Sequence, residues 1–107
     1  MSAVTQVNAS EFETKALQSE QLVVVDFSAT WCGPCRRLEP ELEAVAESLE
    51  GQATFVKVDV DADPELATRF GVQGIPNLTF LKGGKVVDTI VGAVPRTTIL
   101  ARAKALL

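Results

Sequence analysis

The chain of 107 residues contains no histidine and no tyrosine, and its only cysteines are Cys32 and Cys35. A structural zinc ion usually takes four cysteine or histidine ligands, so one copy of this chain cannot supply a usual zinc site. An iron–sulfur cluster shared between two copies remains an alternative for the cysteine pair. The interpretation that we favour is a chain with no metal and no cofactor.

Positive charge and long apolar runs are also scarce. The 10 Lys and Arg residues against 14 Asp and Glu residues give a net charge of −4, which argues against binding to nucleic acid or to an anionic membrane. No stretch approaches the roughly 18 apolar residues of a membrane span. Residues 1–8 have neither the basic start nor the apolar core of a secretion signal, so we expect a cytoplasmic protein whose closely spaced cysteines form a reversible disulfide.

The rest of the composition is that of an ordinary globular protein. Apolar residues make up 47% of the chain and charged residues 22%, a balance that argues against disorder. A chain of this length can bury a core without stapling disulfides. Because no repeat, low-complexity tract or linker interrupts it, we predict one domain over residues 1–107.

Apolar periodicity and turn residues divide the chain into alternating strands and helices. Strands are predicted at residues 4–7, 22–28, 54–59, 77–82 and 86–91. A first helix begins at Asn8, where Glu11 completes a capping pattern. Further helices are predicted at residues 34–49, 63–70 and 95–107, the second of them capped by Asp63.

The order of these elements indicates the fold class. Parallel crossovers are combined with a hairpin whose turn is Gly83-Gly84. Residues 22–28 are too apolar to alternate, which is typical of a strand that is covered on both faces. The sequence therefore predicts an α/β fold with a central mixed sheet and helices on both of its faces.

The two cysteines occur in the segment Trp31-Cys32-Gly33-Pro34-Cys35, between a buried strand and a helix. This context favours dithiol redox chemistry. Cys32 is the candidate nucleophile because the N–H groups at a helix start favour a thiolate, and Cys35, one turn later, is the candidate resolving thiol. Gly33-Pro34 adds no cation that would stabilise the reduced form, so the motif favours a reductant over an oxidant.

Asp26 is an acid inside the otherwise apolar strand 22–28. Burial should raise the pKa of its carboxyl, and burying an acid without a use is costly. The alternative is an aspartate at a strand end that backbone groups satisfy. Lys57, in the strand expected beside it, is the predicted partner of Asp26; a rim lysine extending into water is the alternative reading.

The chain resembles the thioredoxin family over essentially its whole length. The resemblance rests on Val25-Asp26-Phe27, Ala29-x-Trp31-Cys32-Gly33-Pro34-Cys35, Pro40, Lys57-Val58-Asp59, Gly74-Ile75-Pro76, Phe80 and Gly92. It implies the thioredoxin fold with a five-stranded sheet, a proton relay from Asp26 to Cys35, and a cis bond before Pro76. It also implies an apolar patch that docks an extended client peptide, made of Trp31, Gly33, Pro34, Ile75, Pro76, Gly92 and Ala93.

The resemblance further implies a monomeric protein-disulfide reductase. It would carry two electrons to disulfides of client proteins and be reduced again by a thioredoxin reductase, either NADPH-linked or ferredoxin-linked. Two rivals stay open: an isomerase or oxidant, which a reduction potential would separate, and a binding module that works without its cysteines. Arg36-Arg37 is more basic than the family pattern. The pair is a solvated helix face, a surface that steers acidic partners, or an aid to the Cys32 thiolate.

Overall fold

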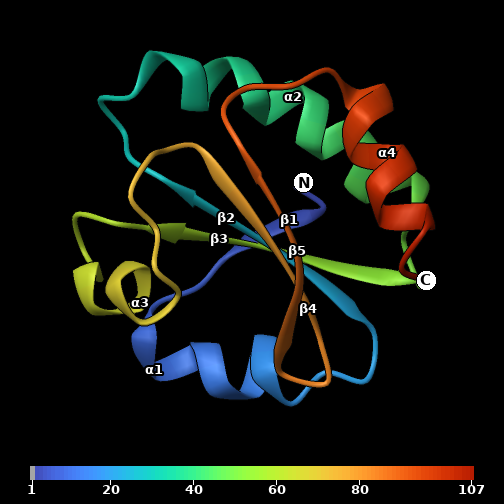
Figure 1. Cartoon of the computed structure of the whole chain (residues 1–107), viewed down its shortest axis with the longest axis horizontal. Coiled ribbons are helices and arrows are strands. Elements are labelled where there is room, and N and C mark those ends of the chain that lie inside the picture. The colour runs from blue at the N-terminus through green and yellow to red at the C-terminus, as the bar shows by residue number, and fades with distance from the viewer. Residues whose placement is uncertain (1) are drawn as a thin grey trace.

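The computed structural model describes residues 2–107 and has the predicted alternation of strands and helices (Figure 1). The elements in chain order are β1 (Val4–Gln6), α1 (Ala9–Phe12), η1 (Glu13–Leu17), β2 (Leu22–Ser28), α2 (Gly33–Ser48), β3 (Ala53–Asp59), α3 (Pro64–Arg69), β4 (Asn77–Lys82), β5 (Lys85–Val91) and α4 (Arg96–Lys104). The largest difference from the predicted bounds is at the end of the chain, where α4 stops at Lys104 rather than at Leu107. No helix among residues 2–107 is long and apolar enough to cross a membrane.

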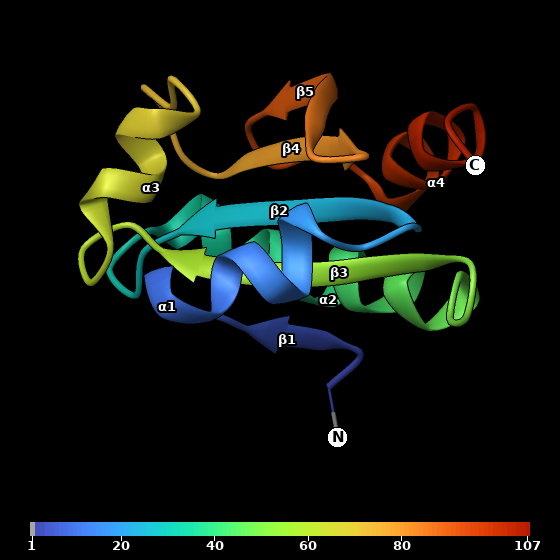
Figure 2. The ribbon, with the colours of Figure 1, turned by 90° about the horizontal axis from the view of Figure 1, so that it is seen from below.

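The five strands form one mixed sheet in the order β1-β3-β2-β4-β5. The central strand β2 runs parallel to β3 and antiparallel to β4 (Figure 2). Every residue of β2 is buried. The hairpin of β4 and β5 turns at Gly83 and Gly84, whose φ angles of 60° and 78° lie in the left-handed region that favours glycine.

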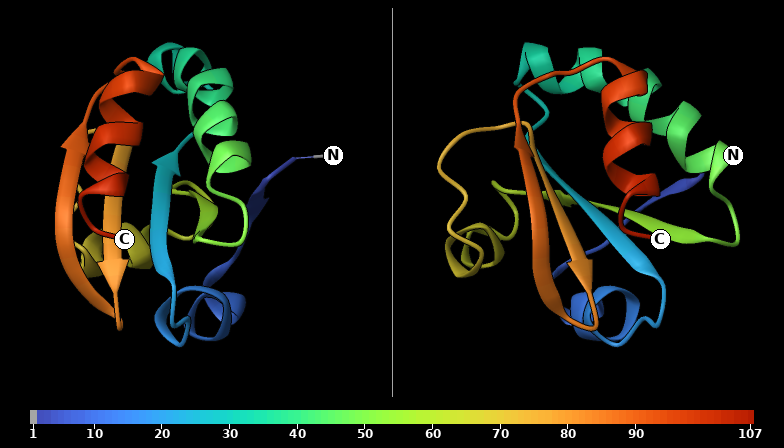
Figure 3. Two further views of the ribbon diagram at one scale, coloured as in Figure 1. Left: turned by 90° about the vertical axis from the view of Figure 1, so that its right-hand side faces the viewer. Right: turned by 45° about the vertical axis from the view of Figure 1, so that its right-hand side comes forward.

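Helices cover both faces of this sheet, α2 and α4 on one side and α1 and α3 on the other (Figures 1 and 3). Alternate residues of β2 point to opposite faces: Leu22 and Val24 pack with the α2 and α4 core, whereas Val23 and Val25 pack with the α1 and α3 core. Asp26 continues the first of these two sets. The strand therefore directs its only acid toward the face that α2 covers.

The first helix has the predicted start but an unpredicted continuation. The Asn8 side chain accepts from Glu11 N and the Glu11 side chain accepts from Asn8 N, both at 3.0 Å, which forms the capping box. After Phe12 the chain continues as the π-helix η1, in which Gln18 N donates to Glu13 O at 3.0 Å. The wider π-helical turn leaves no mark in the apolar periodicity, so the sequence did not indicate it.

Asp63 stands at the predicted start of a helix, but its side chain does not make the capping hydrogen bond that was predicted. Asp63 occupies the N-cap position of α3, but its carboxylate makes no hydrogen bond to that helix. Instead, Asp63 Oδ1 accepts from Ala9 N, the first residue of α1, at 3.2 Å. The first N–H groups of α1 have no partner within their own helix, and tertiary packing brings one of them to Asp63.

Candidate active site

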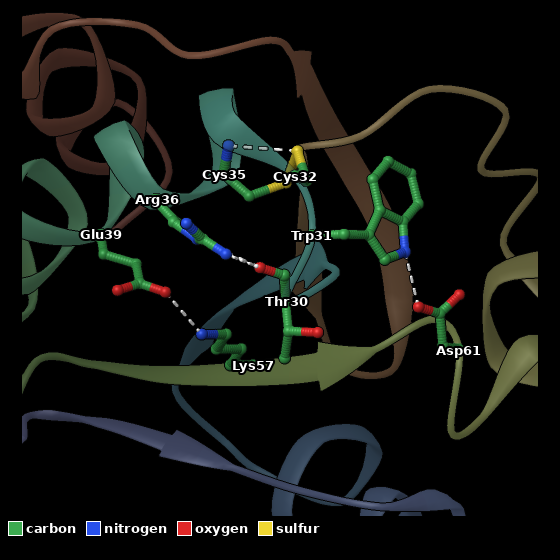
Figure 4. Close-up of a disulfide and its surroundings, with 8 residues drawn as sticks. All are labelled: Thr30, Trp31, Cys32, Cys35, Arg36, Glu39, Lys57 and Asp61. Carbon is green, nitrogen blue, oxygen red and sulfur yellow. Dashed lines mark hydrogen bonds and ion pairs between the residues drawn. A yellow bond between two sulfur atoms is a disulfide. The ribbon is translucent and has the colours of Figure 1, made fainter.

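The cysteine pair lies where β2 passes into α2, at the carboxyl end of the central strand. Cys32 is the N-cap of α2 and forms a disulfide with Cys35, with their Cα atoms 5.2 Å apart (Figure 4). The backbone N–H of Cys35 donates to Cys32 Sγ at 3.2 Å. This donor and the positive end of a 16-residue helix both stabilise negative charge on the Cys32 sulfur once the disulfide is opened.

Both cysteines are buried in a small apolar cluster that also contains Ala29 and is flanked by Val60 and Ile75. Cys35 is 1% exposed and Cys32 is 4% exposed, in the order expected of a resolving thiol and a nucleophile. Residues 2–107 contain no group of three or more histidine, cysteine, aspartate or glutamate side chains placed to hold a metal ion. The chemistry that this arrangement can perform is thiol–disulfide exchange.

Asp26 is buried, as predicted, with 1% of its surface exposed. Its Oδ1 has no hydrogen-bond partner among the described residues, so backbone groups do not satisfy it. Loss of hydration raises the pKa of this carboxyl to about 7; the charge of Lys57 opposes the rise and the charge of Glu39 adds to it. A carboxyl with this pKa can both take up and release a proton near neutral pH.

Lys57 lies directly beside Asp26 in the register of the parallel strands β2 and β3. Its ammonium, however, makes its ion pair with Glu39 of α2, at 2.8 Å between Nζ and Oε1 (Figure 4). Lys57 thus lies beside Asp26, as predicted, and its charge lowers the pKa of that carboxyl, while its ion pair is with Glu39. The sequence analysis missed Glu39 because its spacing on α2 is that of a solvent-facing residue.

A cavity of about 680 Å³ connects these charged groups. Its lining comes from α2, β1, β2, β3 and the residue Ser2 before β1, and consists of Ser2, Val4, Gln6, Asp26, Glu39, Pro40, Leu42, Glu43 and Lys57. Among residues 2–107, the cavity lining includes neither Cys32 nor Cys35. The structure thus joins Asp26 to Lys57 and Glu39 in one site and holds the disulfide in a neighbouring one.

Trp31 is exposed beside the disulfide, with 67% of its surface accessible. Its Nε1 donates to Asp61 Oδ2 at 2.7 Å, which orients the ring (Figure 4). The sequence analysis did not identify Asp61. The usable signal was topological: Trp31 follows β2 and Asp61 follows β3, and the carboxyl ends of neighbouring parallel strands meet at one edge of a sheet.

The other predicted docking residues differ in exposure. Gly33, Pro34 and Ala93 are exposed and Ile75 is half-buried against the cysteine cluster, whereas Pro76 is buried. The Ile75–Pro76 bond is cis, as expected, and Gly92 N donates to Pro76 O at 2.8 Å. Pro76 therefore lies largely beneath the patch, and its part in docking stays a prediction.

Arg36 is more than a solvated residue of the helix. Its Nε and one terminal nitrogen donate to the carbonyl of Thr30 at 3.1 and 2.6 Å, which ties the first turn of α2 to the loop that carries Trp31 (Figure 4). Arg37 is exposed. Of the two arginines, Arg36 is the one that holds the loop before the disulfide.

The chain is similar in sequence to known proteins. The family model described as Thioredoxin matches residues 3–105. Similar curated proteins include Thioredoxin 1 of Nostoc sp., 46% identical over 99 residues that cover 92% of each chain. Thioredoxin of Streptomyces clavuligerus is 48% identical over 94 residues, covering 88% of this chain and 87% of that protein, and thioredoxin of Synechocystis sp. is 44% identical over 99 residues, or 92% of each chain.

Proposed function

The chain belongs to the thioredoxin family, whose members are thiol–disulfide oxidoreductases. We propose that it acts as a protein-disulfide reductase in which three residues have distinct roles. Cys32 is the attacking thiol, Cys35 is the resolving thiol, and Asp26 moves the proton. The observation that carries this assignment is the Cys35 N–H donating to Cys32 Sγ at the start of α2. That contact favours the thiolate on Cys32 and not on Cys35.

In the first step the Cys32 thiolate attacks one sulfur of a client disulfide. A bond forms between Cys32 Sγ and that sulfur, the client disulfide breaks, and the other client sulfur leaves as a thiolate that takes up a proton. In the second step the Cys35 thiol gives its proton to the Asp26 carboxylate and attacks Cys32 Sγ. The mixed disulfide breaks, and the Cys32–Cys35 disulfide forms. The client sulfur leaves as a thiolate that takes up a proton, so the client keeps two thiols and two electrons.

Asp26 suits the proton step because a base is most effective when its pKa lies near the working pH. Burial places its pKa at about 7, so that the acid and its anion are both populated in neutral solution. The cavity that Asp26 lines gives the proton a route that does not pass through the docked client.

Clients dock on the exposed face around Trp31 and Ile75. Among the described residues no hydrogen bond engages the Ile75 backbone, which leaves its N–H and C=O available to an extended peptide. Gly92 at a φ of 97° holds the neighbouring turn without a side chain that would obstruct the peptide.

Membership of the family implies disulfide-containing clients and a thioredoxin reductase as electron donor. We propose that this donor is NADPH-linked or ferredoxin-linked and that the chain works as a single-domain monomer in the cytoplasm. An insulin-reduction assay with each type of reductase separates the donors, because only the matching enzyme sustains turnover. Size-exclusion chromatography with light scattering tests the monomer.

Loss of the Trp31–Asp61 contact is expected to weaken client docking. In Asp61→Ala the indole loses an acceptor worth about 1 kcal/mol, so KM for insulin should rise about fivefold. Asp61→Asn keeps an amide oxygen as an acceptor, so its KM for insulin should lie between those of the wild type and Asp61→Ala. Steady-state kinetics check this, and an unchanged rate with a small aromatic disulfide shows that the thiols are intact. An unchanged KM for insulin in Asp61→Ala would remove this contact from docking.

A further inference from the structure

Lys57 and Glu39 form an ion pair, and both residues line the cavity that contains Asp26. We propose that Glu39 is a positioning residue whose carboxylate holds the Lys57 ammonium toward α2 and away from the buried carboxyl of Asp26. The placement itself rests on the geometry. Its consequence for turnover rests on the proton relay proposed above.

The geometry leaves Lys57 two possible acceptors. Asp26 is its direct neighbour in the β2–β3 register, and in parallel strands such neighbours point their side chains to the same face. Glu39 reaches the same cavity from α2, and Lys57 Nζ lies 2.8 Å from Glu39 Oε1. Asp26 Oδ1 meanwhile has no hydrogen-bond partner among residues 2–107. Lys57 therefore leaves a buried acid unpaired although that acid is adjacent.

The pairing of Lys57 with Glu39 rather than with Asp26 affects protonation, because an ammonium paired with Asp26 would keep the Asp26 carboxyl ionised. An opposite charge at contact distance lowers the pKa of a carboxyl by about 1 to 3. With Lys57 held by Glu39, burial dominates, and the pKa of Asp26 stays near 7. The pair thus keeps Asp26 able to exchange a proton at neutral pH.

The charged groups around Asp26 are few. From α2 the cavity receives Glu39 and Glu43, and from β3 it receives Lys57. The β1 residues in its lining are the uncharged Val4 and Gln6, and the β4 neighbour in register with Asp26 is the apolar Leu78. Both cysteines are tied in the disulfide and do not titrate in the oxidised protein.

Glu43 supplies the matched control. It lines the same cavity one turn further along α2, but its carboxylate accepts from Ser2 Oγ at 3.0 Å and from the backbone N–H of Ala3. Glu43→Gln therefore removes the same charge from the same helix without releasing Lys57. A general effect of acidity near the cavity would appear in both variants.

The test is an NMR titration of the Asp26 carboxyl carbon in the oxidised chain, labelled with ¹³C-aspartate, from about pH 4 to about pH 10. The proteins are the wild type, Glu39→Gln, Lys57→Met, the double variant, and Glu43→Gln. We expect Glu39→Gln to lower the pKa of Asp26 by about 1 or more because Lys57 is free to turn to it. In the Lys57→Met background, the same substitution should have a clearly smaller effect.

Three results overturn the proposal: no change in Glu39→Gln, an equal change with and without Lys57, or an equal change in Glu43→Gln. The pH profile of insulin reduction separates this proposal from the relay. If the pKa of Asp26 falls in Glu39→Gln but the profile does not follow it, the position of Lys57 is upheld and the relay through Asp26 fails.

Discussion

Cys32→Ser is expected to have no measurable reductase activity, whereas Cys35→Ser is expected to accumulate as a mixed disulfide with its client. The first variant keeps only the Cys35 thiol, which is 1% exposed and cannot reach a client disulfide. The second keeps both the nucleophile and the backbone N–H that donates to it, and lacks only the thiol that resolves the adduct. Non-reducing electrophoresis after mixing with insulin distinguishes the two products.

The serine variants are expected to stay folded. Cys32 is the N-cap of α2, and serine is among the preferred residues at that position, so the inactivity of Cys32→Ser is not expected to come from unfolding. The double variant Cys32→Ser/Cys35→Ser serves as the blank for both assays. Trapped clients on Cys32→Ser and none on Cys35→Ser would reverse the two roles.

Asp26→Asn is expected to be more stable than the wild type at neutral pH and to reduce clients at least about tenfold more slowly. The folded state raises the pKa of Asp26 from 3.8 to about 7, so between these values it binds a proton that the unfolded chain has released. Stability therefore falls as the pH rises through this window, by up to about 4 kcal/mol above pH 7. The uncharged amide avoids that loss.

Urea unfolding at about pH 4 and about pH 8 tests the sign of this effect. The two proteins should differ little at the lower pH, where Asp26 is protonated in the folded state, and by about 2–4 kcal/mol at the higher pH. Glu47→Gln, which removes a charge from the exposed face of α2, is the control and should leave stability nearly unchanged. A destabilised Asp26→Asn with normal turnover would contradict the account of the buried acid.

Most of the fold could be predicted because most of its strands and helices have a recognisable pattern within their own short stretch of sequence. The apolar run 22–28, the Asn8–Glu11 box and the Gly83-Gly84 turn each correspond to the observed element. Strand order, the π-helix Glu13–Leu17 and the register shift between Phe80 and Leu81 in the β4–β5 pair could not be predicted, because pairing of strands and wide helical turns have no short-range pattern.

The residues of the candidate site also fall into those that the sequence predicts and those that it does not. The Cys32–Cys35 segment and the acid at Asp26 are local anomalies, and both were found from the sequence. Glu39 and Lys57 are 18 residues apart, and nothing in the spacing on α2 separates Glu39 from an ordinary solvated glutamate. Their pairing exists only because the α2 face and the end of β3 line one cavity.

The central claim is that Cys32 and Cys35 act as one two-electron carrier. The direct measurement is a single turnover: fully reduced protein is mixed anaerobically with excess insulin and no reductase, then quenched with acid, alkylated and analysed by mass spectrometry. The account predicts that each chain opens one insulin disulfide and ends with an intramolecular Cys32–Cys35 disulfide, having lost two hydrogens. Insulin thiols that appear while Cys32 and Cys35 remain alkylatable, or chains that stay bound to insulin, would contradict it.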